Sequence, residues 1–151
     1  MPCRPAHATL VPVTLGTASG TTARTRYDEV NWPFVVITLP PRALTEDEFH
    51  DNLRRMDEYA ARGGEFGFVL DTRGAPDPDA PRRRAIAEYW DACLRRHGDR
   101  FVGAAIVMSS STGRAVFKAI LWLRQNPQRL IPVATTEEGL ERLRALAQSG
   151  P

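Results

Sequence analysis

The chain has 151 residues, the usual size of a single domain, and is long enough to bury a core without a metal or a disulfide. Its 42% hydrophobic and 25% charged residues are typical of a globular protein. The formal net charge of +2 argues against a dedicated nucleic-acid binder, which needs a basic face to displace counterions from phosphates.

The basic residues are unusual in kind. All 20 of them except Lys118 are arginine. A GC-rich coding sequence explains this bias without any function. The alternative is selection for bidentate contacts with anions, which arginine makes and lysine cannot.

The cysteines and the start of the chain indicate a cytoplasmic protein. Cys3 and Cys93 have neither metal-ligand spacing nor a CxxC motif, and free thiols are typical of the reducing cytosol. No run approaches the roughly 20 apolar residues of a membrane span. Pro2, Pro5 and Pro12 interrupt the apolar start of the chain, so we expect no secretory signal and no integral membrane association.

The first part of the chain predicts a flexible segment followed by a hairpin. Residues 1–22 are expected to be flexible, apart from a weak strand signal over Thr9–Leu15. Arg24–Val30 alternates polar and apolar residues, as an edge strand does. Phe34–Leu39 is nearly all apolar and rich in β-branched residues, which predicts a strand covered on both faces.

Helices and strands then alternate. A helix is predicted to begin at Thr45, whose hydroxyl is followed by acidic residues, and to end at Gly63–Gly64. The later elements are a strand over Phe66–Leu70, a helix over about Asp79–His97, a strand over Phe101–Met108, a helix over about Thr112–Arg124, a strand around Leu130–Val133 and a helix over Thr136–Gln148. This order predicts one α/β domain over residues 23–149, with a mostly parallel sheet of about five to six strands and an N-terminal hairpin.

Ligands of open parallel sheets bind beyond the carboxyl ends of the strands. Three loops are expected there, over residues 40–44, 71–81 and 109–114. In the second loop, Asp71 could bind a hydroxyl group or a cation. Alternatively, Asp71 caps neighbouring backbone amides and pairs with Arg73.

Three arginines follow in the first turn of the next helix, where the helix dipole disfavours cations; they are Arg82, Arg83 and Arg84. We expect Asp77 and Asp79 to neutralise them. The alternative is that the arginines contact an acidic partner or a phosphate.

The third loop reads SSSTGR and contains Ser109, Ser110, Ser111 and Arg114. Small hydroxyl residues and a glycine precede a helix there, so exposed amides and the helix dipole could receive an anion, with Arg114 one turn further. The alternatives are a phosphoacceptor serine and a hydroxyl that only caps the helix.

No catalytic constellation is visible. The sequence contains no nucleophile elbow, GxGxxG motif, HExxH motif or paired metal ligands. His7, His50 and His97 are scattered along the chain. We therefore predict no catalytic residue, no bound metal and no cofactor.

The segment AVFKAILWLR is apolar around more of its circumference than a surface helix requires. The expected core stripe consists of Val116, Ala119, Ile120 and Leu123. Either neighbouring segments cover the rest of the helix deeply, or one side meets a partner, because exposed aromatic residues mark interfaces. The second interpretation predicts partner binding through Phe117, Leu121, Trp122 and Arg124.

Four phrases, in the order FGFVLDTRGAP, PRRRAIAEYW, VGAAIVMSSSTGRAVFKAILWLR and TTEEGLERL, resemble the bacterial STAS/Sec14-type (anti-sigma-factor-antagonist-like) domains. The resemblance covers roughly residues 24–147. It implies a non-enzymatic regulatory module, often switched by serine phosphorylation. In that family the phosphoacceptor follows the strand that corresponds to Phe66–Asp71, where this chain has Asp77–Pro81 and no Ser or Thr. Ser109–Ser111 lie one strand too late, so we expect no serine switch.

Together these observations predict a non-enzymatic regulatory or scaffold module that binds a protein partner and is also compatible with homo-oligomers. The alternative is a carrier for an apolar or phosphorylated small ligand, as implied by the Sec14-type relatives.

Overall fold

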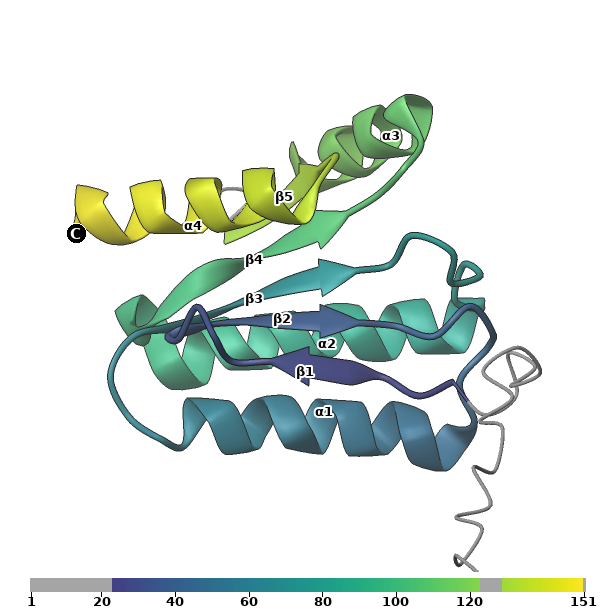
Figure 1. Cartoon of the computed structure of the whole chain (residues 1–151), viewed down its shortest axis with the longest axis horizontal. Coiled ribbons are helices and arrows are strands. Elements are labelled where there is room, and N and C mark those ends of the chain that lie inside the picture. Colours follow the sequence, from purple (N-terminus) through teal and green to yellow (C-terminus); the bar gives the residue numbers. More distant parts are fainter. Residues whose placement is uncertain (1–22, 123–128, 151) are drawn as a thin grey trace, which may run out of the picture.

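The computed structural model describes residues 23–122 and 129–150, which form one sheet with helices on both faces (Figure 1). The elements in chain order are β1 (Arg26–Asp28), β2 (Phe34–Thr38), α1 (Glu46–Ala60), β3 (Phe66–Asp71), α2 (Ala80–His97), the 3-10 turn η1 (Gly98–Arg100), β4 (Phe101–Val107), α3 (Ser111–Trp122), β5 (Leu130–Val133) and α4 (Thr136–Ser149). The segment 1–22, with its expected strand over Thr9–Leu15, lies outside the described residues.

The strands lie side by side in the order in which they follow one another along the chain, β1-β2-β3-β4-β5. β1 is antiparallel to β2, and all other neighbours are parallel. The predicted α/β class, with a mostly parallel sheet and an N-terminal hairpin, is therefore confirmed.

This strand order decides which face each helix covers. Every parallel crossover steps to the next strand in the same direction, and right-handed crossovers then place their helices on one face. The core on that face joins residues of α1, α2 and α3 to every second residue of the strands; it includes Val35, Ile37, Met56, Tyr59, Phe68, Trp90 and Phe117. The core on the other face is closed by α4 and includes Val36, Val69, Val107, Val133, Leu140 and Leu143.

Strand β2 shows the result of this two-sided cover. Its residues Phe34, Val35, Val36 and Ile37 are all buried, and consecutive residues belong to opposite cores. The nearly continuous apolar run is thus explained by burial on both faces, as the sequence predicted.

Helix starts follow the capping chemistry expected from the sequence. At α1, the Thr45 hydroxyl accepts a hydrogen bond from the Glu48 amide, and the Glu48 carboxylate accepts one from the Thr45 amide. The Asp79 carboxylate caps α2 at the Arg82 amide, and the Thr135 hydroxyl caps α4 at the Glu138 amide. These bonds satisfy amides that a helix start leaves without partners.

Helix α4 lies unusually close to the sheet at Gly139. A Cβ atom at this position would lie 3.0 Å from the Ala105 Cβ and 3.1 Å from a Val69 methyl group. The absence of a side chain therefore lets one helix approach β3 and β4 closely enough to close this core.

The outer edge of β5 carries a proline. The Val133 carbonyl accepts a hydrogen bond from the Met108 amide, so the backbone polar groups of Val133 point toward β4. Because these groups alternate in direction along a strand, those of Pro132 point away from the sheet. Proline has no N–H to offer at that outer edge.

None of the helices within the described residues is both long enough and apolar enough to cross a bilayer.

We predict that Gly139→Val lowers the free energy of unfolding by about 1–3 kcal/mol, because the added atoms overpack the α4 contact with the sheet. Gln148→Val is the matched control, since Gln148 is exposed on the same helix and reports only the helix propensity of valine. Urea unfolding of both variants measures the difference. Equal stability of the two variants would contradict a close helix–sheet contact at Gly139.

Candidate functional site

Polar side chains follow one another at one end of the sheet, across the carboxyl ends of β2 and β3 and the amino end of the antiparallel β1. Arg26 pairs in register with Thr38, Thr38 with Asp71, and Asp71 with Val107. Residues in register on neighbouring strands point to the same face, and Val107 belongs to the α4 core. Arg26, Thr38 and Asp71 therefore lie on the α4 side of the sheet, where the loop after β3 begins.

Asp71, at the β3 end of this row, forms a closed pair with Arg73. The Arg73 guanidinium donates to both carboxylate oxygens of Asp71, at 3.0 and 2.8 Å, and the Arg73 amide donates at 3.1 Å. The Arg73 hydrogen bonds, followed in effect by the charges of Arg73 and Arg26, hold the pKa of Asp71 below its ordinary value. The capping and pairing alternative is thus the one observed. A carboxylate whose pKa is lowered and whose oxygens already accept hydrogen bonds is a poor general base.

In the segment before and at the start of α3, polar side chains are likewise engaged in hydrogen bonds with the local backbone. The Ser110 hydroxyl accepts a hydrogen bond from the Gly113 amide at 3.1 Å, which is the capping arrangement. The Arg114 guanidinium donates to the Met108 carbonyl at 2.6 Å. Ser109 and Ser111 are exposed. Because α3 begins at Ser111, the expected loop 109–114 ends at Ser110, and Ser111 and Arg114 lie in the first turn of the helix. Two of the four residues, Ser110 and Arg114, are engaged in local hydrogen bonds.

The first loop contains a pair that the sequence analysis did not single out. Arg42 donates to both carboxylate oxygens of Glu48, at 2.8 and 2.7 Å, and to the Ala23 carbonyl at 2.7 Å. These hydrogen bonds from Arg42, together with that from the Thr45 amide, lower the pKa of Glu48 to about 2. The capping-box spacing of Thr45 and Glu48 was the available signal for this pair.

The arginines at the start of α2 do not pair with the expected aspartates. Arg82 donates to Glu46 on α1 at 2.8 Å and to the Leu44 carbonyl at 2.7 Å. Asp79 is used as the helix cap, and the Arg83 guanidinium donates to the Pro78 carbonyl. The prediction that Asp77 and Asp79 neutralise this cluster is therefore wrong for Arg82, because a carboxylate of the neighbouring helix lies within reach.

The side of α3 that packs against the core differs from the predicted side. Val116 is 54% exposed and Ala119 is exposed, so the expectation that they belong to the core is wrong. Phe117 is partly buried and packs against the core shared with α1 and α2. The side chains of Ile120, Leu121 and Trp122, and all of Leu123 and Arg124, lie outside the described residues.

The remaining reactive groups of the described residues do not join this row. Cys93 is buried, and burial, followed by the charge of Asp57, raises the pKa of its thiol to about 12. His97 lies edge-on to Phe66 with ring centroids 5.2 Å apart, at the amino ends of the strands, and burial lowers its pKa. His50 lies on α1, on the opposite face of the sheet from Asp71, where it faces Glu46 at 3.6 Å. Of the histidines that the structure describes, neither His50 nor His97 therefore forms a Ser–His–Asp set with Asp71.

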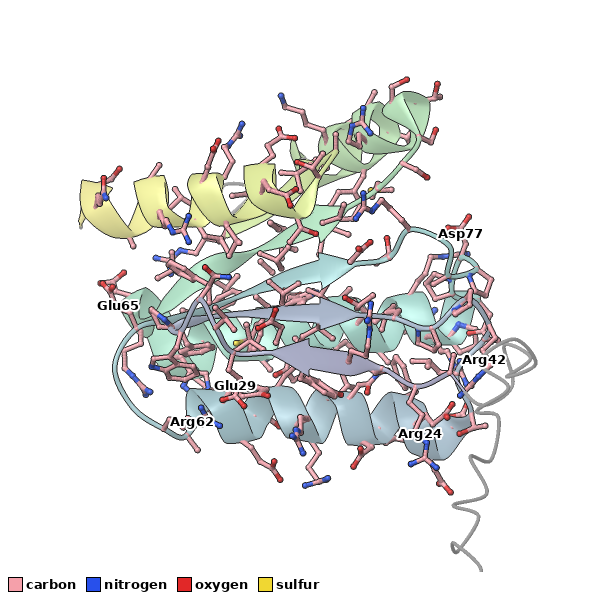
Figure 2. All side chains as sticks on the ribbon, in the orientation of Figure 1. Arg24, Glu29, Arg42, Arg62, Glu65 and Asp77 are labelled. Carbon is pink, nitrogen blue, oxygen red and sulfur yellow. The ribbon has the colours of Figure 1, made fainter. Side chains whose placement is uncertain are left out.

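Figure 2 shows the charged groups at the two ends of the sheet, with Arg42 and Asp77 at the carboxyl ends and Glu29 and Arg62 at the amino ends. Across residues 23–122 and 129–150, no group of three His, Cys, Asp or Glu side chains is placed to hold a metal ion. The arrangement offers paired charges and hydroxyl groups for recognition, and it offers no activated nucleophile among the residues described above.

Comparison of the chain with models of protein families, with curated proteins and with solved structures finds no significant match. The resemblance to STAS-type domains therefore rests on the sequence phrases and on the order of the elements.

The Arg42–Glu48 pair predicts a pH dependence. Because the folded pKa of Glu48 is about 2, below the ordinary value of about 4.3, the pair stabilises the fold above pH of about 4. This contribution is lost as the pH falls toward 2. Glu48→Gln should lower stability at pH 7, and the difference from the native chain should shrink between pH 4 and pH 2.

Thermal unfolding over that pH range tests this prediction, with Glu141→Gln, an exposed position on α4, as the control. A stability difference that is independent of pH would show that the carboxylate charge of Glu48 does not contribute.

The cap of α3 gives a second prediction. Ser110→Ala should lower the free energy of unfolding by about 1 kcal/mol, because the Gly113 amide loses its acceptor. Ser109→Ala, at an exposed neighbouring position, should have little effect. Phosphate added at constant ionic strength should leave the melting temperature unchanged. A bound anion would instead raise it, because binding to the native state alone adds RT ln(1 + [L]/Kd) to the free energy of unfolding.

Proposed function

We propose that the chain is a non-enzymatic module of the STAS type that binds a protein partner through the outward face of α3. The observation that supports this most directly is the exposure of Val116, at 54%, on a helix of a domain whose other large apolar side chains are mostly buried. Together with the exposed Ala115 and Ala119, one turn apart on the same helix, Val116 forms a contiguous apolar patch, and such patches mark sites of protein contact.

The composition of this face also favours binding. The exposed described residues of α3 are Ser111, Thr112, Ala115, Val116, Lys118 and Ala119, with one charge among them. The exposed residues of α2, by contrast, are mostly charged and include Arg83, Arg84, Glu88, Arg95 and Arg96. Low charge is the compositional mark of the buried centre of an interface.

The pairing of charges supports binding over chemistry. Asp71, Glu48 and Glu46 are each paired with an arginine near the carboxyl ends of the strands, in the loops and in the first turns of α1 and α2. Such pairs give a fixed charge pattern that a partner can recognise. A carrier of phosphorylated ligands has less support, since Ser110 and Arg114 already bond to the backbone.

We further propose that the domain stays in one binding state, which phosphorylation does not switch. The helix start after β3 is occupied by Asp79, whose carboxylate caps α2, and the nearby Thr72 hydroxyl donates to the Val107 carbonyl at 2.8 Å. A phosphoserine would bring about −1.5 to −2 charges and three acceptor oxygens, which a fixed carboxylate imitates only in part. Affinity for the partner is therefore proposed to be independent of kinases acting at that position.

We expect Val116→Asp to abolish capture of the partner while changing the free energy of unfolding by less than about 0.5 kcal/mol, because Val116 contributes to the surface and little to the core. The measurement is quantitative affinity purification from native cells, with Gln148→Asp on α4 as the charge-matched control. The supporting result is a protein retained by the native chain and by the control and lost with Val116→Asp. Identical retention by all three would refute α3 as the binding face.

A further inference from the structure

The first strand of the sheet has an open outer edge. β1 lies at one end of the strand order, and no other described strand lies beyond it (Figure 1). It is three residues long, Arg26–Asp28, and it pairs with β2 alone. An open edge presents backbone N–H and C=O groups to which a further strand can bind.

The register shows which backbone groups point outward. The Leu39 amide donates to the Asp71 carbonyl of β3, so the backbone polar groups of Leu39 point toward β3. Those of Thr38 then point toward β1, and Thr38 forms a hydrogen-bonded pair with Arg26, its partner in register. Hydrogen-bonded and non-hydrogen-bonded pairs alternate in an antiparallel ladder. The N–H and C=O groups of Tyr27 therefore point away from β2, into the open edge.

The side chain of Tyr27 offers a contact surface at this edge. Its hydroxyl donates to Asn52 of α1 at 2.5 Å, and its ring packs against the core on that face. The residue is nevertheless only half-buried, with the Arg55 guanidinium 5.0 Å from the centre of the ring. A β-branched side chain on a strand beside β1 would cover more of this ring, and such cross-strand pairs stabilise neighbouring strands.

The chain that precedes β1 is held beside the same edge. Arg42, which pairs with Glu48 of α1, also donates to the Ala23 carbonyl at 2.7 Å and so fixes the backbone just before β1. Residues 1–22 come before this point and lie outside the described residues. Their last part, Gly16–Thr22, is rich in turn-forming residues. A segment joined through so short a connection meets β1 in the antiparallel direction and at a high effective concentration.

The sequence of residues 9–15, TLVPVTL, fits this edge in one phase. Proline is compatible with an edge strand when its nitrogen faces solvent. With Pro12 facing outward, the alternation of backbone groups directs those of Val11 and Val13 toward β1. A valine paired with Tyr27 through these groups has its side chain on the α1 side of the sheet, next to the tyrosine ring.

We propose that residues 9–15 pair with β1 as an antiparallel sixth strand, with Val11 or Val13 opposite Tyr27. This strand covers the open edge of β1 and makes Tyr27 part of a continuous ladder. The new outer edge carries Pro12, so the row of donors at that end of the sheet is interrupted, as it is at β5 by Pro132. The outward face of α3 has no part in this contact.

Hydrogen exchange of the full chain, followed by NMR, tests the proposal. The Tyr27 amide points out of the five-stranded sheet, so it exchanges without protection unless a further strand accepts its hydrogen bond. In the native chain we expect its exchange to be slowed by about tenfold or more. Val11→Pro combined with Val13→Pro removes the N–H groups that face β1, and it should abolish this protection.

Leu10→Pro combined with Thr14→Pro is the matched control. These positions share the phase of Pro12, so their N–H groups face solvent and Tyr27 should stay protected. The amide of the buried Val69 in β3 reports on folding and should exchange equally slowly in both variants. An unprotected Tyr27 amide in the native chain, or equal Tyr27 protection in the two double variants, would overturn the proposal. Protection that disappears on dilution would also overturn it, because the added strand would then come from another copy of the chain.

Discussion

The structure depends on the strand order. With four parallel strands taken in sequence, every right-handed crossover helix lies on the same face, and only the last helix is free to cover the other. The second core therefore rests on α4 alone. Gly139 makes this cover effective by letting the helix lie against Ala105 and Val69.

One helix cannot cover five strands. Helix α4 starts after β5 at the carboxyl ends of the strands and reaches Asn31, before β2, through Arg144. This diagonal course leaves an uncovered corner on each side. One corner holds the polar row of Arg26, Thr38 and Asp71. The other is a shallow groove lined by Ile131, Arg142, Ala145, Leu146 and Ser149. Both surfaces are thus consequences of covering a wide sheet with a single helix.

Much of this architecture could be predicted from local patterns. The apolar run of β2 and the capping box at Thr45 indicate their structures through burial and backbone chemistry that act within a few residues. The direction of α3 could not be predicted in this way, because a helix that is apolar on most sides offers no single stripe to choose. The partner of Arg82 is equally non-local, since Glu46 comes from another helix and only the packing of α1 beside α2 brings it within 2.8 Å.

Pro132 has a consequence for the behaviour of the protein at high concentration. An exposed strand at the end of a sheet is a template on which further chains can add strands without limit. At β5, the missing N–H interrupts the row of donors that such growth requires. Continuous strand pairing at this edge, of the kind that leads to fibrils, is therefore disfavoured.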